Sequence, residues 1–238
     1  MKLLIVSATS FELDPLQRFL EEQYLQVGNY RYRKGKLEIH LLITGVGQAL
    51  TAFSMGKVLA QTPYDLCINM GIAGAFNRKL EIGQVVQVSS ERFADLGVEE
   101  ADGSFTDIHS MNLIPPNQAP FQDSQLLNNE IQGSGFLPLA KGISVNKVHG
   151  YPASIDKVVE KFNPDIESME GAAFFYACLV ENVPFMEIRS ISNYVEARNR
   201  DNWNIPLAID QLNEVIQAMV QSFESLTTET GGRGIGFR

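Results

Sequence analysis

The chain has 238 residues, of which 45% are hydrophobic and 20% charged, and its formal net charge is -9. This length and composition are typical of one soluble globular domain with a well-buried core. The acidic balance and the lack of clustered Lys and Arg argue against nucleic acid as a partner, because binding to a phosphate backbone requires a basic surface. No apolar run is long enough to cross a membrane.

The two cysteines and three histidines predict neither a disulfide framework nor a metal site. Cys67 and Cys178 each lie inside an apolar segment, far from any CxxC spacing. His40, His109 and His149 are scattered without HxxxH-type spacing. We therefore expect reduced core cysteines in a cytoplasmic protein, and no metal.

Short apolar runs alternate with segments of helical period, which predicts a single α/β domain, a three-layer α/β/α arrangement with a central mixed sheet. The N-terminal stretch MKLLIVSATSFEL reaches polar residues too soon for a secretory signal and is predicted to form the first strand. In chain order, the predicted strands are 2–8, 30–34, 36–44, 64–70, 84–89, 140–147 and 184–192. The predicted helices are 11–24, 48–61, 153–162, 169–182 and a long amphipathic helix capped by Asn204, with Pro206 in its first turn.

Two segments lack this periodicity. Residues 97–135 are rich in Gly, Pro, Asn, Asp and Gln, and a loop of this length inside a compact domain is usually a lid or an interface. Phe105 and Asp107 could close over a ligand there, although packing of a surface loop is an equal interpretation. We take residues 1–226 as the domain and 227–238 (TTETGGRGIGFR) as a mobile end.

Four short stretches fall at the ends of predicted strands, where open α/β sheets bind ligands: TSFE, TGVGQ, NMGIAG and SNYVEAR. Singly, each is explained by turn formation, and TGVGQ lacks both the GxGxxG fingerprint and the P-loop lysine. A fifth stretch, IESMEGAAFFYACL, places Glu167 and Glu170 where an apolar helix is predicted to begin. The helix dipole alone would favour acidic residues at that point.

In their order and combination, these stretches resemble the purine nucleosidase and nucleoside phosphorylase superfamily over nearly the whole chain. The most similar members are the methylthioadenosine/adenosylhomocysteine nucleosidases and, nearer still, the futalosine hydrolases of menaquinone biosynthesis. Three segments resemble the futalosine hydrolases in particular: ADLGVEEADGSFTDI, SVNKVHG and IRSISNYVEARNRDNW. The resemblance implies a nucleoside phosphorylase-like fold, an N-glycosyl hydrolase without a cofactor, a small nucleoside substrate and a homo-oligomer.

The resemblance also implies roles for individual residues. Glu12 matches the carboxylate that positions and deprotonates the attacking water. Glu170 matches the carboxylate that binds the ribose hydroxyls and stabilises the oxocarbenium-like transition state, while Met169 packs against the sugar. Gly74 of NMGIAG falls in the substrate-binding site. For Glu167, the simple helix-start interpretation stays competitive.

Two departures from the family pattern concern the leaving base and the nucleophile. Asn193 stands where adenine-releasing nucleosidases carry an aspartate, and its fixed amide donor suits the acceptor atoms of a 6-oxopurine such as hypoxanthine. A simple turn role for Asn193 is the alternative. Asn69 stands where the phosphorylases carry a phosphate-binding arginine, so water is favoured as the nucleophile. Arg78 lies just downstream, but a surface role explains it better.

The remaining contacts are less well defined. His149 or Val148 of SVNKVHG could stack on the purine, and the register between them stays open. Arg198 is a candidate for the carboxylate of futalosine because it lies close in sequence to Asn193.

The sequence thus predicts hydrolysis of the N-glycosidic bond of futalosine with release of hypoxanthine. The alternatives are an adenine-releasing nucleosidase, a purine nucleoside phosphorylase and a silent nucleoside-binding module on the same fold. Asn193 argues against the first and Asn69 against the second. The presence of both Glu12 and Glu170 argues against the third, because binding alone does not require a water-activating base.

Overall fold

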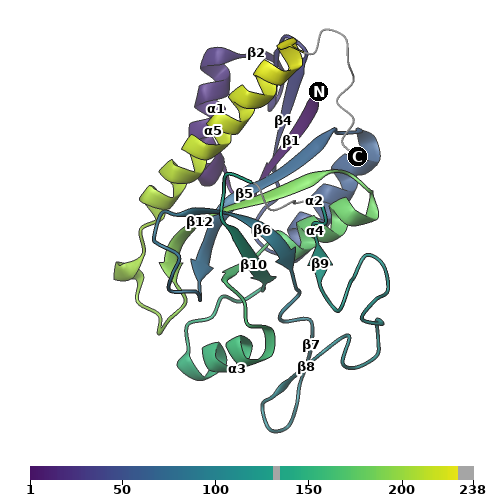
Figure 1. The fold of residues 1–238 in the computed structure, drawn as a ribbon, viewed down its shortest axis with the longest axis vertical. Coiled ribbons are helices and arrows are strands. Elements are labelled where there is room, and N and C mark those ends of the chain that lie inside the picture. The colour runs from purple at the N-terminus through teal and green to yellow at the C-terminus, as the bar shows by residue number, and fades with distance from the viewer. Residues whose placement is uncertain (131–134, 230–238) are drawn as a thin grey trace.

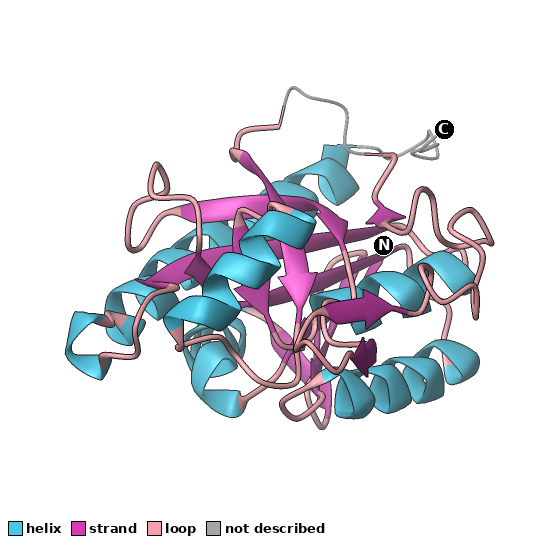
Figure 2. Cartoon of the chain, turned by 90° about the horizontal axis from the view of Figure 1, so that it is seen from below, coloured by secondary structure: helices cyan, strands magenta, loops and turns pink. Residues whose placement is uncertain are grey.

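The computed structural model describes residues 1–130 and 135–229, and it shows helices on both faces of a mixed β-sheet (Figures 1 and 2). The strands are β1 (Lys2–Ser7), β2 (Leu25–Gly28), β3 (Arg31–Lys34), β4 (Leu37–Ile43), β5 (Leu66–Ala75), β6 (Val85–Glu91), β7 (Gly97–Glu99), β8 (Phe105–Asp107), β9 (Leu126–Leu127), β10 (Leu139–Ser144), β11 (Ile166–Ser168) and β12 (Phe185–Tyr194). The helices are α1 (Ser10–Gln23), α2 (Gln48–Gln61), α3 (Pro152–Phe162), α4 (Gly171–Val180) and α5 (Ile205–Glu229), with a short 3-10 turn at Arg200–Asn202.

The main sheet combines an open half and a closed half. Its strand order is β11-β10-β6-β12-β5-β1-β4-β3-β2, and β1 runs parallel to both β4 and β5. Strand β11 pairs with β10 and also, antiparallel, with β5. Strands β5, β12, β6, β10 and β11 therefore close into a ring, and the ends of β5, β11 and β12 meet on one side of it.

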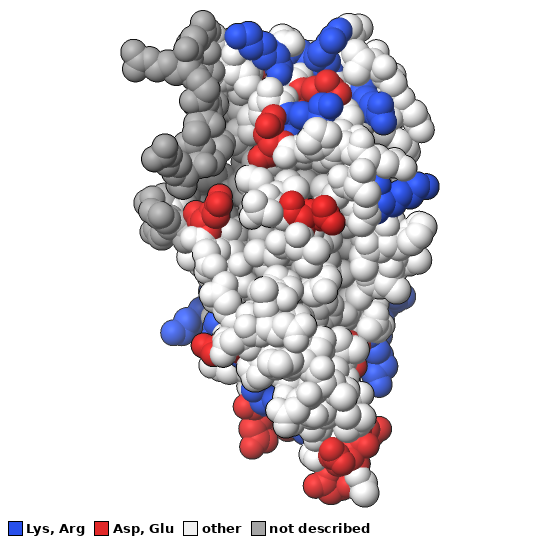
Figure 3. Space-filling view, turned by 90° about the vertical axis from the view of Figure 1, so that its right-hand side faces the viewer, with Lys and Arg blue, Asp and Glu red and all other residues white. Residues whose placement is uncertain are grey.

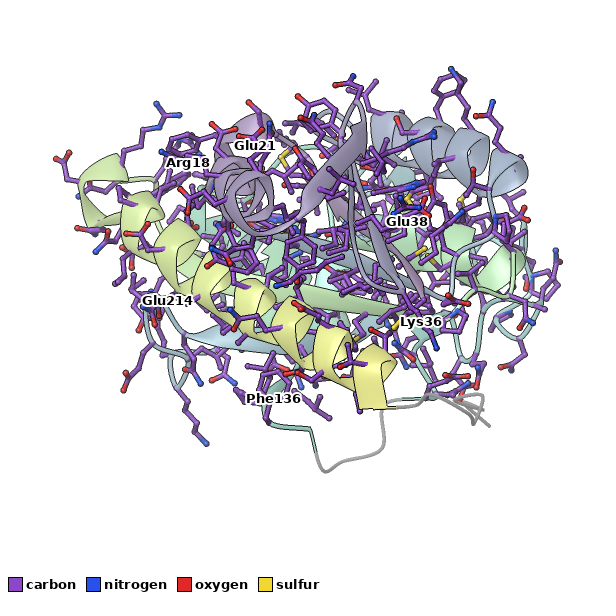
Figure 4. All side chains as sticks on the ribbon, turned by 90° about the horizontal axis from the view of Figure 1, so that it is seen from above. Arg18, Glu21, Lys36, Glu38, Phe136 and Glu214 are labelled. Atoms are coloured by element: carbon purple, nitrogen blue, oxygen red, sulfur yellow. The ribbon has the colours of Figure 1, made fainter. Side chains whose placement is uncertain are left out.

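Two large apolar cores lie between the sheet and its helices, and a third, smaller one lies against α3. Side chains of β1 alternate between the two large cores, as the two-residue period of a strand requires: Leu3 and Ile5 pack in the core under α1 and α5, and Leu4 and Val6 in the core that includes α2 and α4. The outer faces of α1 and α5 carry exposed charged side chains such as Arg18 and Glu214 (Figure 4). This arrangement explains the helical spacing of apolar residues in both segments.

Local sequence signals fix the helix ends. Thr9 caps α1, and Glu12 completes a capping box with it. Asn204 caps α5, accepting a hydrogen bond from Leu207 N at 3.2 Å, as predicted. Helix α5 extends to Glu229, so residues 227–229 of the predicted tail are helical, while 230–238 lie outside the described residues.

Several boundaries differ from the prediction because pairing over long sequence distances overrides local glycine and turn signals. Strands β5 and β12 continue to residues 75 and 194, so NMGIAG and the start of SNYVEAR are strand residues. Glu167 lies in β11 and not at a helix start. Residues 97–130 include the β7–β8 hairpin, which Lys161 of α3 holds through Asp107 at 2.9 Å.

The surface carries charges of both signs. Figure 3 shows one face with a broad uncharged middle, basic and acidic side chains mixed at one end, and acidic ones gathered at the other. Within the described ranges, no helix has the length and apolarity of a membrane span. The same residues contain no group of three or more His, Cys, Asp or Glu side chains arranged to hold a metal ion.

Candidate active site

A cavity of about 360 Å³ opens where β1, β5, β11 and β12 end. Seven of the eight predicted site residues line it: Glu12, Gly74, Val148, His149, Met169, Glu170 and Asn193. These residues come from five separate parts of the sequence. The topology brings them together in two ways: β1, β5 and β12 run parallel and end on the same side, and the antiparallel pairing of β11 with β5 closes the ring beside them.

Glu12 is buried at the start of α1 with both carboxylate oxygens engaged. Its Oε2 accepts hydrogen bonds from Ser7 Oγ at 3.0 Å, Thr9 N at 3.1 Å and Thr9 Oγ1 at 2.9 Å. Its Oε1 accepts one from Ile72 N at 3.2 Å. These donors fix the carboxylate at the cavity wall, so the same side chain serves the helix cap and the site.

Glu170 is far from Glu12 in the sequence but lines the same cavity. Its Oε1 accepts a hydrogen bond from Gly47 N at 3.0 Å, and its Oε2 lies 3.9 Å from Arg189 Nη1. Burial raises the pKa of the Glu170 carboxyl, while the Arg189 cation and the Gly47 N–H act in the opposite direction. Gly47 has a φ of 100°, which favours glycine. The TGVGQ stretch thus contributes a backbone donor to Glu170.

Gly74 lies between two polar side chains across the sheet. It pairs with Asn193 of β12 on one side and with Glu167 of β11 on the other. A Cβ atom at this position would lie 2.9 Å from Val195 Cγ2 and 3.3 Å from Asn193 Nδ2. The missing side chain therefore leaves the floor of the cavity open between Asn193 and Glu167.

The Asn193 amide is held by its neighbours in β12. Ser192 Oγ donates to Asn193 Oδ1 at 2.8 Å, and Nδ2 donates to the Tyr194 carbonyl at 3.0 Å. An amide nitrogen carries two hydrogens, so one N–H of Asn193 stays available to a ligand. The amide can donate a hydrogen bond, but it cannot transfer a proton.

Glu167 has a larger role in the site than the sequence indicated. It accepts hydrogen bonds from His149 N at 3.0 Å and from His149 Nδ1 at 2.7 Å. A carboxylate only accepts, so Nδ1 carries the hydrogen and Nε2 of a neutral ring is left as an acceptor. The ring also lies edge-on to Phe76, at 6.3 Å between centroids. Both His149 and Val148 line the cavity, which leaves the choice of stacking residue open.

Arg198 does not line the cavity. Its side chain is exposed and stacks on Trp203, with the guanidinium carbon 5.1 Å from the ring centroid. Trp203 does line the cavity, together with Phe11 and Val46, none of which the sequence singled out. A lone aromatic or aliphatic residue gives no sequence signal of a binding role until the fold shows what lies beside it.

Two further positions bear on anion binding. Asn69 is buried within β5 and is not among the lining residues. Arg78 lies outside the cavity, bonded to Glu196 at 2.8 Å and stacked over Tyr194. Among the described residues, the cavity lining contains no lysine or arginine.

A second hollow of about 770 Å³ lies against α3 and the β7–β8 hairpin. It shares His149 with the first cavity and includes Phe105 in its lining. The segment that was predicted as a lid or an interface thus borders a space next to the site.

A family model described as the phosphorylase superfamily matches residues 2–228. The chain belongs to the phosphorylase superfamily. It is 29% identical to a futalosine hydrolase of Thermus thermophilus over 231 residues, covering 96% of both chains. It is 32% identical to a 5'-methylthioadenosine/S-adenosylhomocysteine nucleosidase of Maridesulfovibrio salexigens over 216 residues, covering 82% of this chain and 87% of the relative.

Solved structures give the same fold. A crystal structure of the Campylobacter jejuni 5'-methylthioadenosine/S-adenosylhomocysteine nucleosidase superposes with a TM-score of 0.75 at 21% identity, covering 94% of this chain and 99% of that one. The predicted α/β fold with a mixed central sheet is confirmed. The predicted superfamily and the enzyme class, an N-glycosyl hydrolase, are also confirmed.

Proposed function

We propose that this enzyme hydrolyses the N-glycosidic bond of futalosine and releases hypoxanthine, which would place it in menaquinone biosynthesis in the cytoplasm. The observation that carries the choice of base is Asn193, whose amide is held at the cavity beside Gly74 with one N–H available. N7 and O6 of a 6-oxopurine both accept hydrogen bonds, whereas adenine presents an amine at C6. A fixed donor therefore favours the 6-oxopurine.

In the proposed reaction, water attacks the C1' carbon of the ribose and gives one proton to Glu12. The bond between C1' and the purine nitrogen breaks, and its electron pair leaves with the purine. The transition state carries positive charge on the sugar, which the Glu170 carboxylate stabilises through the ribose hydroxyls. Asn193 stabilises the departing purine by a hydrogen bond, and the purine then takes its proton from solvent water.

Water is the proposed nucleophile because the described cavity lining offers no cation for a phosphate dianion. Asn69 and Arg78, the two positions that bear on this question, both lie away from the lining. Met169 and the pair His149/Val148 complete the proposed contacts with sugar and base. Arg198 lies outside the lining and stacks on Trp203, which belongs to it, so the proposed contact with the substrate carboxylate would be made beside Trp203.

A homo-oligomer is also proposed. Phe11 and Val46 line the cavity and are exposed, and Phe53 on the neighbouring helix α2 is 72% exposed. Exposed apolar groups clustered beside a site are typical of a protein interface. Light scattering coupled to gel filtration would measure the mass in solution, and a monomer at micromolar concentration would contradict this proposal.

A second function is favoured by the relative at 32% identity, a 5'-methylthioadenosine/S-adenosylhomocysteine nucleosidase. The deciding experiment measures base release from futalosine, inosine and methylthioadenosine, each with and without phosphate, with the purine identified by chromatography. Hypoxanthine release from futalosine that does not depend on phosphate supports the first function. Faster adenine release from methylthioadenosine supports the second, and dependence on phosphate would support a phosphorylase.

A further inference from the structure

A buried group of charged side chains lies directly beneath the site. Arg189 of β12 is 1% exposed, and its Nε donates to Glu187 Oε1 at 2.7 Å. Its Nη1 lies 3.9 Å from Glu170 Oε2. A side chain at Gly71 would collide with Arg189 Nη1 and would also touch Glu12 Oε1. The guanidinium therefore lies between Glu187 below and the two glutamates of the site above.

A fourth carboxylate reaches this group from β6. Glu91 is fully buried, and its Oε2 accepts a hydrogen bond from Ser144 Oγ at 2.9 Å. A side chain at Gly171 would collide with Glu91 Oε1 and with both carboxylate oxygens of Glu187. Both carboxylates thus border the small space that this glycine leaves at the start of α4.

Some polar atoms that border this space have no hydrogen-bond partner among the described residues. Glu91 Oε1 and Glu187 Oε2 are buried, and neither has a partner in the described structure. Leaving such atoms unsatisfied is costly, and two ionised carboxylates facing one apolar space repel each other. Burial, and then the charge of Glu187, raise the pKa of the Glu91 carboxyl well above its usual range.

We propose that Glu187 is a positioning residue that holds the Arg189 guanidinium away from Glu12 and Glu170, and that Glu91 keeps one shared proton beside it. This inference rests on the proposed roles of Glu12 and Glu170. With Glu187 ionised, one arginine is divided among three carboxylates. The Glu12 and Glu170 carboxylates then stay available to the water and to the ribose hydroxyls. With Glu187 neutral, the cation would pair more closely with both carboxylates and compete with these ligands for them.

The test compares Glu187→Gln with Glu38→Gln, a control in a half-buried ion pair with His40 on β4 (Figure 4). Glu187→Gln should lower kcat by about tenfold or more while KM changes by less than about threefold. The acid limb of its kcat/KM profile should move to lower pH, because the repulsion between Glu187 and Glu170 is lost. The Glu38→Gln control should leave both quantities unchanged.

A purely structural role for Glu187 predicts a different result. Glu187→Gln would then lower the urea midpoint while the folded fraction kept the wild-type kcat and the wild-type acid limb. That outcome would overturn the positioning role. If the wild type hydrolyses another purine nucleoside instead of futalosine, the same comparison is made with that substrate.

The shared proton has a readout that does not use activity. The raised pKa of Glu91 means that its contribution to stability is present at low pH and is lost as the pH rises toward that pKa. Glu91→Gln cannot lose a proton. Its urea midpoint relative to wild type should therefore rise between about pH 5 and about pH 8. A difference that stays constant over this range would show that Glu91 holds no proton in the folded protein, whatever the substrate is.

Discussion

Glu12→Gln separates the helix-capping role that the structure shows for this side chain from its proposed role as the base. The carboxylate accepts four hydrogen bonds, three at Oε2 from Ser7 and Thr9 and one at Oε1 from Ile72 N. A glutamine has one oxygen and one NH2 group in place of the two oxygens. The capping box also works with glutamine, so the oxygen should face Thr9. The NH2 group then faces the Ile72 N–H, and that hydrogen bond is lost.

The two losses differ in size. Removing one hydrogen bond to a charged, buried group costs about 1 to 3 kcal/mol of the free energy of unfolding. Removing a general base costs about 10²- to 10⁴-fold in rate. Shape and polarity at the cavity wall stay nearly the same, so the nucleoside should still bind. We therefore expect kcat to collapse while KM changes by less than about threefold and the protein stays folded.

The assay combines steady-state hypoxanthine release with urea unfolding of the same preparations. Asp14→Asn, an exposed position on the same helix, is the matched control and should leave kcat and the urea midpoint unchanged. A loss of kcat below tenfold in a folded Glu12→Gln protein would mean that Glu12 serves the helix cap and not the water. A rise in KM equal to the fall in kcat would contradict the assigned role in a different way, since it would indicate lost binding.

Three further predictions concern the rest of the cavity. Asn193→Asp should shift the ratio of kcat/KM values away from 6-oxopurine nucleosides toward adenine nucleosides by about tenfold or more, because the fixed amide donor is lost; an unchanged ratio would show that base recognition lies elsewhere. Glu167→Gln should raise KM several-fold with a smaller change in kcat, because the N–H and the Nδ1 of His149 donate to different oxygens of Glu167 and glutamine replaces one of these oxygens by an NH2 group; an unchanged KM would mean that the orientation of the His149 ring does not matter. The midpoint of the acid limb of the kcat/KM profile should lie above about pH 4.3, the pKa of an exposed glutamate, because burial raises the pKa of Glu170 and the ionised form is needed. A midpoint at or below that pH would contradict the role of Glu170.

Much of the fold was predictable because the spacing of apolar residues and the capping residues are local features of the sequence. The helix at 48–61 matches the prediction at both ends, and the Asn204 cap and Pro206 of the last helix follow from adjacent residues. Strand burial was also readable, since an apolar run such as LLIV in β1 needs two covering layers. The extensions of β5 and β12 were not predictable, because residues 71–75 carry turn-like glycines and become strand only by pairing with β11 and β12.

The sequence by itself determined the chemical groups of the proposed site: Glu12, Glu170, Asn193 and the glycines whose missing side chains leave room for them. Their order along the chain was enough to indicate the superfamily. Only the tertiary structure decided which of these groups meet. Glu167 accepts hydrogen bonds from His149, and Arg189 lies within ion-pair distance of both Glu170 and Glu187. Arg198 stays outside the cavity. The reason is physical: side-chain type is local information, whereas hydrogen-bond partners and burial depend on which strands the fold places side by side.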